Sequence, residues 1–277
     1  MTELICPVCK SNEVKVQEKR LELYYCNSCT HCFTNLDEDP SLYHNLYFSQ
    51  ERENWFKYPD VPLYEHVYRR IISLVPPPMK LIDVGCGNAA FLKSLKKKEK
   101  PIELYGIDLV ENSYPGINFI RGDFNSFDIK EKFDVVTSFM AIEHLRDVDF
   151  FIKKITKISN ERSSWLIINT INNNSLIYLF ARLLNKFGFR TAHDRLYSRH
   201  HLNHFTNKSL KILVEKNGFK VIEHWNHNYP MIKVDVPKSS VLFEKLYRFG
   251  IFLMFRISDV IGNGHSQTII ANKEWRK

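Results

Sequence analysis

A turn rich in small residues follows an apolar segment between residues 81 and 92, and its residue types suit a nucleotide-like ligand. Gly85 and Gly87 would let backbone N–H groups approach such a ligand closely. The segment lacks the GxxxxGKS or GxxxxGKT sequence of a phosphate-gripping loop and fits the looser dinucleotide pattern only weakly. Asp83 precedes the first glycine by two residues, where its charge would repel a pyrophosphate but would suit a ligand carrying an ammonium group and a sulfonium. The turn therefore favours an adenosine compound with positive charge.

Two Cys-x-x-Cys pairs near the start of the chain have the spacing of a zinc ribbon. The four predicted ligands are Cys6, Cys9, Cys26 and Cys29. Two such knuckles on facing hairpins place four thiolates tetrahedrally around one ion. Four protein ligands leave no open coordination position, so we expect a structural Zn²⁺ outside the reaction. His31 and Cys32 are expected to be neighbours of this site instead of ligands, and Cys86 to fill space inside the glycine turn.

The segment DVGCGNAA at residues 83–90 resembles motif I of class I S-adenosylmethionine-dependent methyltransferases. The segments YGID, FIRGDF, FDVVTSFMAIEHL and HHLNHFT extend the resemblance over residues 64–272. The resemblance implies S-adenosylmethionine as the cofactor, and the binding residues that it implies are Asp83, Gly85, Gly87, Asp108, Asp123 and Phe124. In the family, the equivalent of Asp108 takes the two ribose hydroxyls. The equivalents of Asp123 and Phe124 bind the adenine amino group and pack on the adenine ring.

Two departures from the family pattern affect what we expect of the cofactor site. The third glycine of motif I is Ala89 here, which narrows the clearance at the methionine end. Eight residues separate Asp108 from the next expected strand, so the helix usual at this place must be short or absent. A zinc ribbon ahead of such a domain also resembles a group of bacterial methyltransferases of sugar, polysaccharide and secondary-metabolite pathways, although ribbons occur in RNA-modifying enzymes as well.

Methylation of a hydroxyl requires a base, and histidine is the natural candidate near neutral pH. His144, in AIEHL, is the first candidate, with a helix-capping role as the alternative. Glu143 is expected to support it. Related hydroxyl methyltransferases can hold a divalent cation here, but the site looks incomplete because an upstream acidic position is Met140. His201 is the second candidate base, and the three histidines of RHHLNHFT are expected to form a lid or to bond to the loop instead of binding metal.

The sequence after the expected fourth strand lacks the motifs of two other reactions of the superfamily. The sequence SFMAIEH contains neither the Asp/Asn-Pro-Pro-Phe/Tyr motif of base amino methylation nor the cysteine of pyrimidine C5 methylation. We therefore expect O-methylation of a small-molecule, sugar or polysaccharide hydroxyl. The alternatives are an RNA or protein methyltransferase that docks its substrate through the ribbon, and an inactive methyltransferase fold that serves as a binding scaffold.

The alternation of strand-like and helix-like segments predicts an α/β fold with a Rossmann-like, doubly wound, seven-stranded sheet. The expected strands are residues 80–84, 103–108, 117–120, 133–139, 164–171, 219–225 and 266–271. The expected helices are residues 64–75, 89–99, 147–159 and 207–217. The expected parts are a zinc ribbon at 1–36, an aromatic linker and helix at 37–78, and a methyltransferase domain at 79–277 with insertions at 172–206 and 228–264.

The chain carries a net charge of +8, which favours an anionic acceptor and leaves RNA or an anionic membrane surface open. No secretory signal and no apolar run long enough to span a membrane is evident, so a cytoplasmic location is expected. One helical face in the second insertion is apolar: Leu242, Leu246, Phe249, Leu253, Ile257 and Val260. We expect this face to pack on the sheet or to cap the pocket. The alternative is peripheral contact with a membrane or a lipid-linked substrate, aided by Lys245, Arg248 and Arg256.

Overall fold

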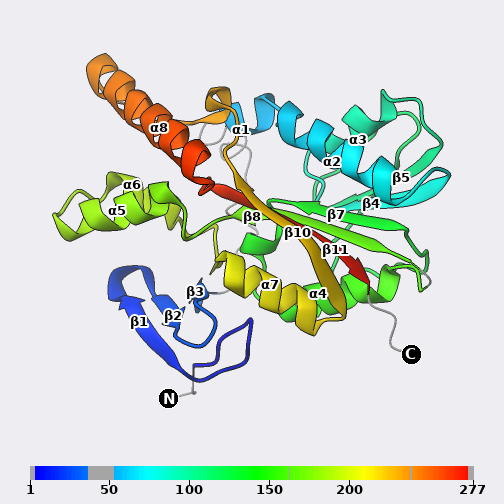
Figure 1. Cartoon of the computed structure of the whole chain (residues 1–277), viewed down its shortest axis with the longest axis horizontal. Helices are drawn as coiled ribbons and strands as arrows, with labels where there is room; N and C mark the ends of the chain where they lie inside the picture. Colours follow the sequence, from blue (N-terminus) through cyan, green and yellow to red (C-terminus); the bar gives the residue numbers. More distant parts are fainter. Residues whose placement is uncertain (1–3, 37–52, 162, 238, 274–277) are drawn as a thin grey trace.

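A seven-stranded sheet with helices on both faces dominates the computed structural model, which describes residues 4–36, 53–161, 163–237 and 239–273 (Figure 1). Residues 37–52 of the expected linker lie outside the described residues. The strands are β4 (Met79–Val84), β5 (Ile102–Asp108), β6 (Asn118–Arg121), β7 (Val135–Phe139), β8 (Trp165–Ile171), β10 (Phe219–His227) and β11 (Ser266–Lys273). Their order is β10-β11-β8-β7-β4-β5-β6. β4 to β8 run parallel, and β11 is antiparallel to both of its neighbours. The predicted Rossmann-like α/β class is confirmed.

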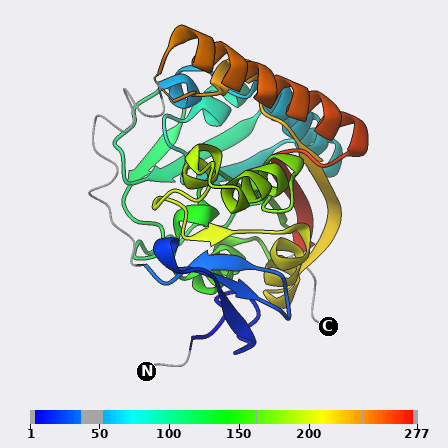
Figure 2. The ribbon, with the colours of Figure 1, turned by 90° about the vertical axis from the view of Figure 1, so that its left-hand side faces the viewer.

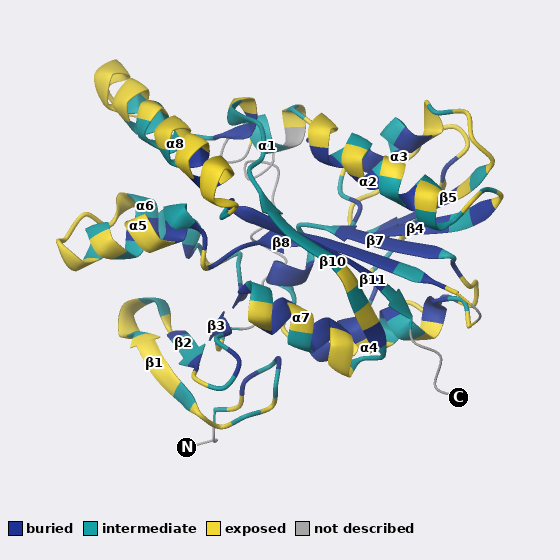
Figure 3. Ribbon diagram, viewed as in Figure 1, coloured by how far each residue is buried: buried dark blue, intermediate teal, exposed yellow. Residues whose placement is uncertain are grey.

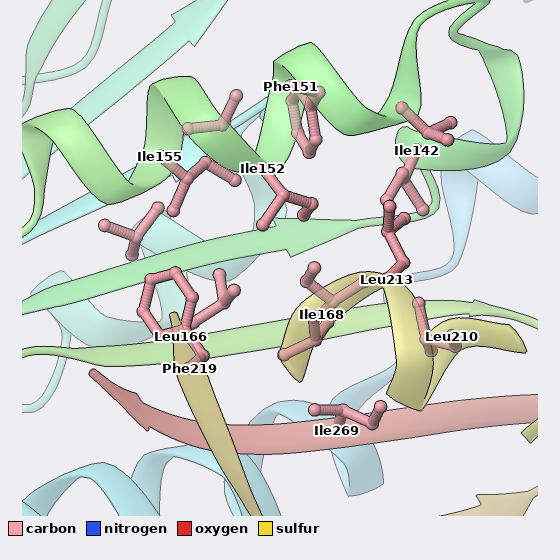
Figure 4. Packing of buried hydrophobic residues seen from close by; sticks show 14 of the residues in the cluster. Ile142, Phe151, Ile152, Ile155, Leu166, Ile168, Leu210, Leu213, Phe219 and Ile269 are labelled. Carbon is pink, nitrogen blue, oxygen red and sulfur yellow. The ribbon is translucent and has the colours of Figure 1, made fainter. Parts of the chain in front are cut away.

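Alternate strand residues build two hydrophobic cores, one on each face of the sheet. Leu166 and Ile168 of β8 pack with Phe151 and Leu213 on one face (Figure 4). Ile167, between them, belongs to the core of the other face. The covering helices are α4 (Val148–Ile158) and α7 (Asn207–Lys216) on the first face, and α2 (Val61–Leu74) and α3 (Ala90–Lys96) on the second. Burial on both faces is why these strands read as nearly continuous apolar runs.

The expected elements are present within a few residues of their predicted bounds. Asp60 caps α2 by accepting a hydrogen bond from the Leu63 amide at 3.2 Å. α7 ends at Asn217 and Gly218, and Gly218 has a φ of +89°, as the Asn-Gly pair predicts. Residues 109–117 contain no helix, which agrees with the short connection after Asp108.

The N-terminal segment forms a small sheet that the first insertion completes. Its strands are β1 (Val14–Glu18), β2 (Leu23–Cys26) and β3 (Cys32–Thr34), with the short helix η1 (Lys19–Leu21) between the first two. β9 (Asn203–His204) pairs antiparallel with β3 as a fourth strand. The cysteine-rich segment and the insertion are therefore joined by backbone hydrogen bonds, a link that no local sequence pattern predicts.

The two insertions add helices beside the carboxyl edge of the sheet. The first insertion contains α5 (Leu176–Lys186) and α6 (Thr191–Leu196), and the second contains η5 (Met231–Lys233) and α8 (Val241–Ile261). Two short helices lie outside the insertions, α1 (Glu53–Lys57) and η4 (Ile142–His144). The α5–α6 pair and α8 project from the same side of the molecule, the left in Figure 1 and the side that faces the viewer in Figure 2. None of the described helices is long and apolar enough to cross a lipid bilayer.

The expectation that the apolar face of α8 packs on the sheet is wrong, and of its six residues only Leu253 lines the cavity. The six side chains of that face, from Leu242 to Val260, are between 43% and 87% exposed. α8 is held by its opposite side, where Phe255 and Ser258 are buried, and its N-terminal half extends beyond the sheet (Figure 3). An amphipathic pattern shows that a helix has an apolar face but not what covers that face.

Candidate functional site

A cavity of about 1120 Å³ lies at the carboxyl edge of the sheet and brings the predicted cofactor residues together. The glycine turn forms part of its wall. Gly85 has a φ of +72°, and a Cβ placed there would lie 2.6 Å from Ala141 Cβ, so no larger residue fits this approach of two loops. Ala89, which replaces the third glycine, also adopts a left-handed backbone with a φ of +58° just before α3. The turn thus keeps its glycine-like shape at a small conformational cost.

Asp83 lies beneath this turn and is almost fully buried. Its carboxylate accepts a hydrogen bond from Thr137 Oγ1 at 2.7 Å. Burial raises the pKa of Asp83 to about 7, because the hydrogen bond from Thr137 only partly offsets the loss of water and the Asp108 charge adds to it. A carboxylate in this position would gain from a cationic ligand that replaces the missing solvent.

The next two strands place the other predicted cofactor groups along the same cavity. Asp108 ends β5, and its two carboxylate oxygens accept hydrogen bonds from the amides of Gly87 at 2.7 Å and Val110 at 2.9 Å. Asp123 accepts from the Asn125 amide and from a serine hydroxyl in the loop after β6. Phe124 is buried against α4 and supplies a flat apolar wall. A carboxylate at each strand end and one aromatic ring suit an adenosine ligand.

The two candidate bases lie together in the cavity lining beyond β7, whereas Asp108 and Asp123 follow β5 and β6 on the other side of β4. His144 ends η4, and His201 comes from the first insertion, with a distance of 5.0 Å between their ring centroids. His144 Nδ1 lies 2.6 Å from the carbonyl oxygen of His200. A carbonyl can only accept, so this nitrogen carries the proton, and Nε2 is the basic nitrogen of the neutral ring.

Glu143 provides the third group beside the two histidines. It is fully buried and accepts a hydrogen bond from Thr170 Oγ1 at 2.8 Å. Burial raises its pKa to about 7. Ligand atoms of Glu143, His144 and His201 all lie within 4.8 Å of one another and could hold a cation. Sequence reasoning missed this group, because the third ligand comes from His201 and not from the position of Met140.

The three histidines of RHHLNHFT do not act as one cluster. His200 offers its backbone carbonyl to His144, and His201 faces the cavity. His204 lies in β9, where it is fully buried against Tyr197, and burial lowers its pKa to about 3. The segment therefore lines the site, but His204 serves the packing beneath it.

The lining of the cavity also includes cationic side chains that sequence reasoning did not single out. They are Arg195 and Arg199 of the first insertion and Lys233 of the second. Lys233 Nζ lies 4.1 Å from the ring centroid of Trp55, and burial lowers its pKa to about 8. The sequence identified the two insertions that carry these cations but not the individual residues.

The four predicted zinc ligands converge at the cysteine-rich end. The Sγ atoms of Cys6 and Cys29 are 3.6 Å apart, as are those of Cys9 and Cys26, and all four lie within 4.8 Å of one another. Sulfur atoms on a tetrahedral zinc with bonds of about 2.3 Å are separated by about 3.8 Å, far more than the roughly 2 Å of a disulfide. The cluster therefore fits Zn²⁺.

The two knuckles have the same backbone shape. Lys10 and Thr30 each follow the second cysteine of a pair, and their φ values are +61° and +64°. Each donates its amide to the carbonyl of the first cysteine in its pair, at 3.0 and 2.9 Å. His31 Nε2 is 2.9 Å from Asn203 Oδ1, so this histidine contacts the insertion and, among the described residues, is not part of the cysteine group.

The fold and the cavity define a class I S-adenosylmethionine-dependent methyltransferase. A family model described as a methyltransferase domain matches residues 62–224, more than half of the chain, so the chain belongs to this family.

Curated relatives and a solved structure agree with this class. The chain is 28% identical over 113 residues to the ubiquinone biosynthesis O-methyltransferase of Pelagibacter ubique, covering 37% of this chain and 46% of that protein. It is 25% identical over 182 residues to the mitochondrial ubiquinone biosynthesis O-methyltransferase of Dictyostelium discoideum, covering 57% and 55%. The chain thus spans about half the length of these relatives. A SAM-dependent methyltransferase from Archaeoglobus fulgidus has the same fold, with a TM-score of 0.53, 18% identity, and coverage of 83% of this chain and 100% of that one.

The cysteine cluster predicts one tightly held zinc ion per chain. Metal analysis of the purified protein should find zinc in a one-to-one ratio. The double substitution Cys6→Ser with Cys29→Ser should abolish it, because two of four thiolates are lost. Cys32→Ser, a neighbouring buried cysteine outside the cluster, is the matched control and should retain the metal. A wild-type chain without zinc after expression in zinc-supplemented medium would refute the assignment.

The buried carboxyl of Asp83 predicts a pH-dependent affinity for S-adenosylmethionine. A cationic ligand binds the ionised form, so lowering the pH from 8 to 6, through a pKa of about 7, should weaken binding about tenfold. Calorimetry at several pH values measures this effect. Asp83→Asn should bind weakly with little pH dependence, whereas the exposed Asp128→Asn should match the wild type. Identical pH profiles for wild type and Asp83→Asn would contradict the assigned contact.

Proposed function

We propose that this methyltransferase methylates a hydroxyl oxygen of a small molecule, with sugars and polysaccharide precursors among the candidate acceptors. The observation that carries the proposal is the fixed tautomer of His144 in the cavity lining beyond β7. Its Nε2 is the basic nitrogen, as deprotonation of a hydroxyl requires. The two curated relatives are named O-methyltransferases, which supports oxygen as the acceptor atom.

The proposed cofactor residues are those that line the adenosine end of the cavity: Asp83, Gly85, Gly87, Asp108, Asp123 and Phe124. S-adenosylmethionine supplies a methyl carbon bonded to a positively charged sulfur. His144 Nε2 would accept the proton of the acceptor hydroxyl whose oxygen takes that methyl group, with S-adenosylhomocysteine as the leaving group. Alignment of the two reactants within the cavity provides most of the acceleration.

The cationic part of the cavity lining favours an anionic acceptor. Arg195, Arg199 and Lys233 line the cavity from both insertions. Guanidinium groups form paired hydrogen bonds with carboxylates and phosphates, and a partly desolvated ammonium group strengthens the attraction. A phosphorylated or carboxylated acceptor would therefore bind more tightly than its neutral analogue.

We also propose that residues 1–36 form a structural zinc ribbon, residues 37–78 a linker and helix, and residues 79–277 the methyltransferase domain. β3 of the ribbon pairs with β9 of the insertion that carries His201, so the ribbon takes part in building the acceptor wall. This arrangement favours a supporting role over a ribbon that recruits RNA or protein. Thiolate ligands persist in reducing surroundings, which agrees with our expectation of a cytoplasmic location.

The choice of base can be tested by single substitutions. The wild type is first incubated with methyl-labelled cofactor and a panel of nucleotide sugars, oligosaccharides, phenols and RNA to identify the labelled acceptor. His144→Ala should then lower the turnover number about 100-fold, while calorimetric binding of S-adenosylmethionine is retained. His201→Ala should cost less if His201 only shapes the site. His66→Ala is the control, because His66 packs against Trp225 with the two rings tilted and does not line the cavity.

The same experiment distinguishes the alternatives. Equal activity of both histidine variants and the wild type would refute base catalysis by this pair. A different outcome is that EDTA abolishes activity, and that Mg²⁺ restores it in the wild type but not in Glu143→Gln. That result would assign Glu143, His144 and His201 to a cation site. RNA as the labelled acceptor would overturn the small-molecule proposal. A chain that fails to bind the cofactor at all would be an inactive scaffold.

A further inference from the structure

The exposed apolar surface of the insertions is larger than a single helix face. On α8, Val260, Leu242 and Leu246 are 87%, 68% and 61% exposed. On α5 and the turn after it, Phe187 and Phe189 are 72% and 67% exposed. The other exposed apolar residues of the two segments are Leu179, Phe180, Leu183, Val241, Phe243, Phe249, Phe252, Leu253, Ile257 and Ile261. Contiguous apolar surface on this scale marks an interaction site.

The two segments form one surface, which we call the α5–α8 surface. α5 and α8 contact each other, and both project from the same side of the molecule (Figures 1 and 2). Their outer ends are largely exposed, as Figure 3 shows. A partner that meets this side of the molecule would therefore reach both helices at once.

Positive charge borders the apolar side chains. On α8, Lys245 and Arg256 are exposed and, at 100° per residue, lie beside the apolar face. Lys186 and Arg190 are exposed on either side of the two phenylalanines that follow α5. Across residues 176–199 there are five basic residues and one acidic residue. Long basic side chains can keep their charges at a headgroup layer while their stems cover apolar surface.

Acidic groups near the surface are engaged with the protein. Glu244 accepts a hydrogen bond from the Ser239 amide at 2.9 Å. Asp259 accepts from Asn228 Nδ2 at 2.7 Å. Arg248, which the sequence suggested as a further cation for this surface, instead donates to the carbonyls of Met231 and Val234. These hydrogen bonds do not neutralise the two carboxylates, but across α8 and residues 176–199 the basic residues outnumber the acidic ones.

We propose that the α5–α8 surface docks the protein on an anionic lipid bilayer, with α8 lying in the plane of the headgroups. Exposed leucine and phenylalanine side chains flanked by lysine and arginine are the signature of an interfacial helix. No described helix can span the bilayer, so the contact is peripheral. A second copy of the chain fits less well, because two surfaces that both carry an excess of positive charge would repel each other.

The docked orientation has a consequence for the acceptor, and this step rests on the proposed function. Phe180 and Leu184 of α5 and Leu253 and Met254 of α8 also line the cavity. The cavity therefore borders the surface that would face the lipid. An amphiphilic acceptor with an apolar chain and an anionic head would reach the base without crossing bulk water.

Vesicle binding tests the docking. The purified protein is mixed with phosphatidylcholine vesicles, with and without phosphatidylglycerol, and the bound fraction is measured by flotation. Wild type should bind the anionic vesicles at least about tenfold more tightly than the neutral ones, and added salt should weaken the binding. Leu246→Gln with Phe249→Gln, and separately Phe187→Gln with Phe189→Gln, should each lower the partition coefficient about tenfold. Lys245→Glu with Arg256→Glu should remove the preference for anionic vesicles.

The control replaces apolar residues that are similarly exposed elsewhere, Val16→Gln with Ile222→Gln, and should bind vesicles as the wild type does. Every variant should keep its affinity for S-adenosylmethionine, which shows that it is folded and separates this test from that of the proposed function. Equal binding by wild type and the α8 variant would overturn the proposal. A wild-type dimer in light scattering that becomes monomeric in the variants, without vesicle binding, would assign the surface to a second copy.

Discussion

The hydrogen bond from the Gly87 amide to the Asp108 carboxylate, 2.7 Å long, ties the glycine turn to the end of the neighbouring strand. The parallel register of β4 and β5 makes this contact available, because Val84 pairs with Ile107 and both strands end at the same edge. Gly85 then allows the loop after β7 to approach, since any side chain at this position would collide with Ala141. The shape of the cofactor end follows from strand order and one turn, and the insertions are free to vary around it.

The reaction end depends on contacts between distant parts of the chain. Leu202 donates its amide to the Glu143 carbonyl at 2.8 Å, and Asn203 Nδ2 donates to the Leu145 carbonyl. On its other side, the same short segment pairs with β3. His201 is thus placed beside His144 by a strand of two residues held between the loop after β7 and the cysteine-rich sheet. The cofactor end and the reaction end therefore have different supports.

The sequence correctly predicted the features that depend on residues close together in the chain. The run from Asp83 to Gly87 identified the turn, and the apolar periodicity identified the strands, because both depend on neighbouring residues. The pairing of β9 with β3 could not be predicted, since a two-residue strand has no periodicity and its partner is far away in the chain. The face of α8 was recognised but wrongly assigned to the interior, because sequence alone does not reveal how far a helix reaches beyond the sheet. Lys233 was missed because an isolated cation in a loop carries no signal.

The position of the cysteine cluster has a physiological consequence. Oxidation of those thiols, or scarcity of the ion they would bind, would loosen the small sheet first and then the strand that carries His201 into place. The adenosine end, supported by the central sheet, would survive. Such a molecule would still bind its methyl donor but would not transfer the methyl group. Methylation would therefore respond more steeply than donor binding to the redox state and metal supply of the cell.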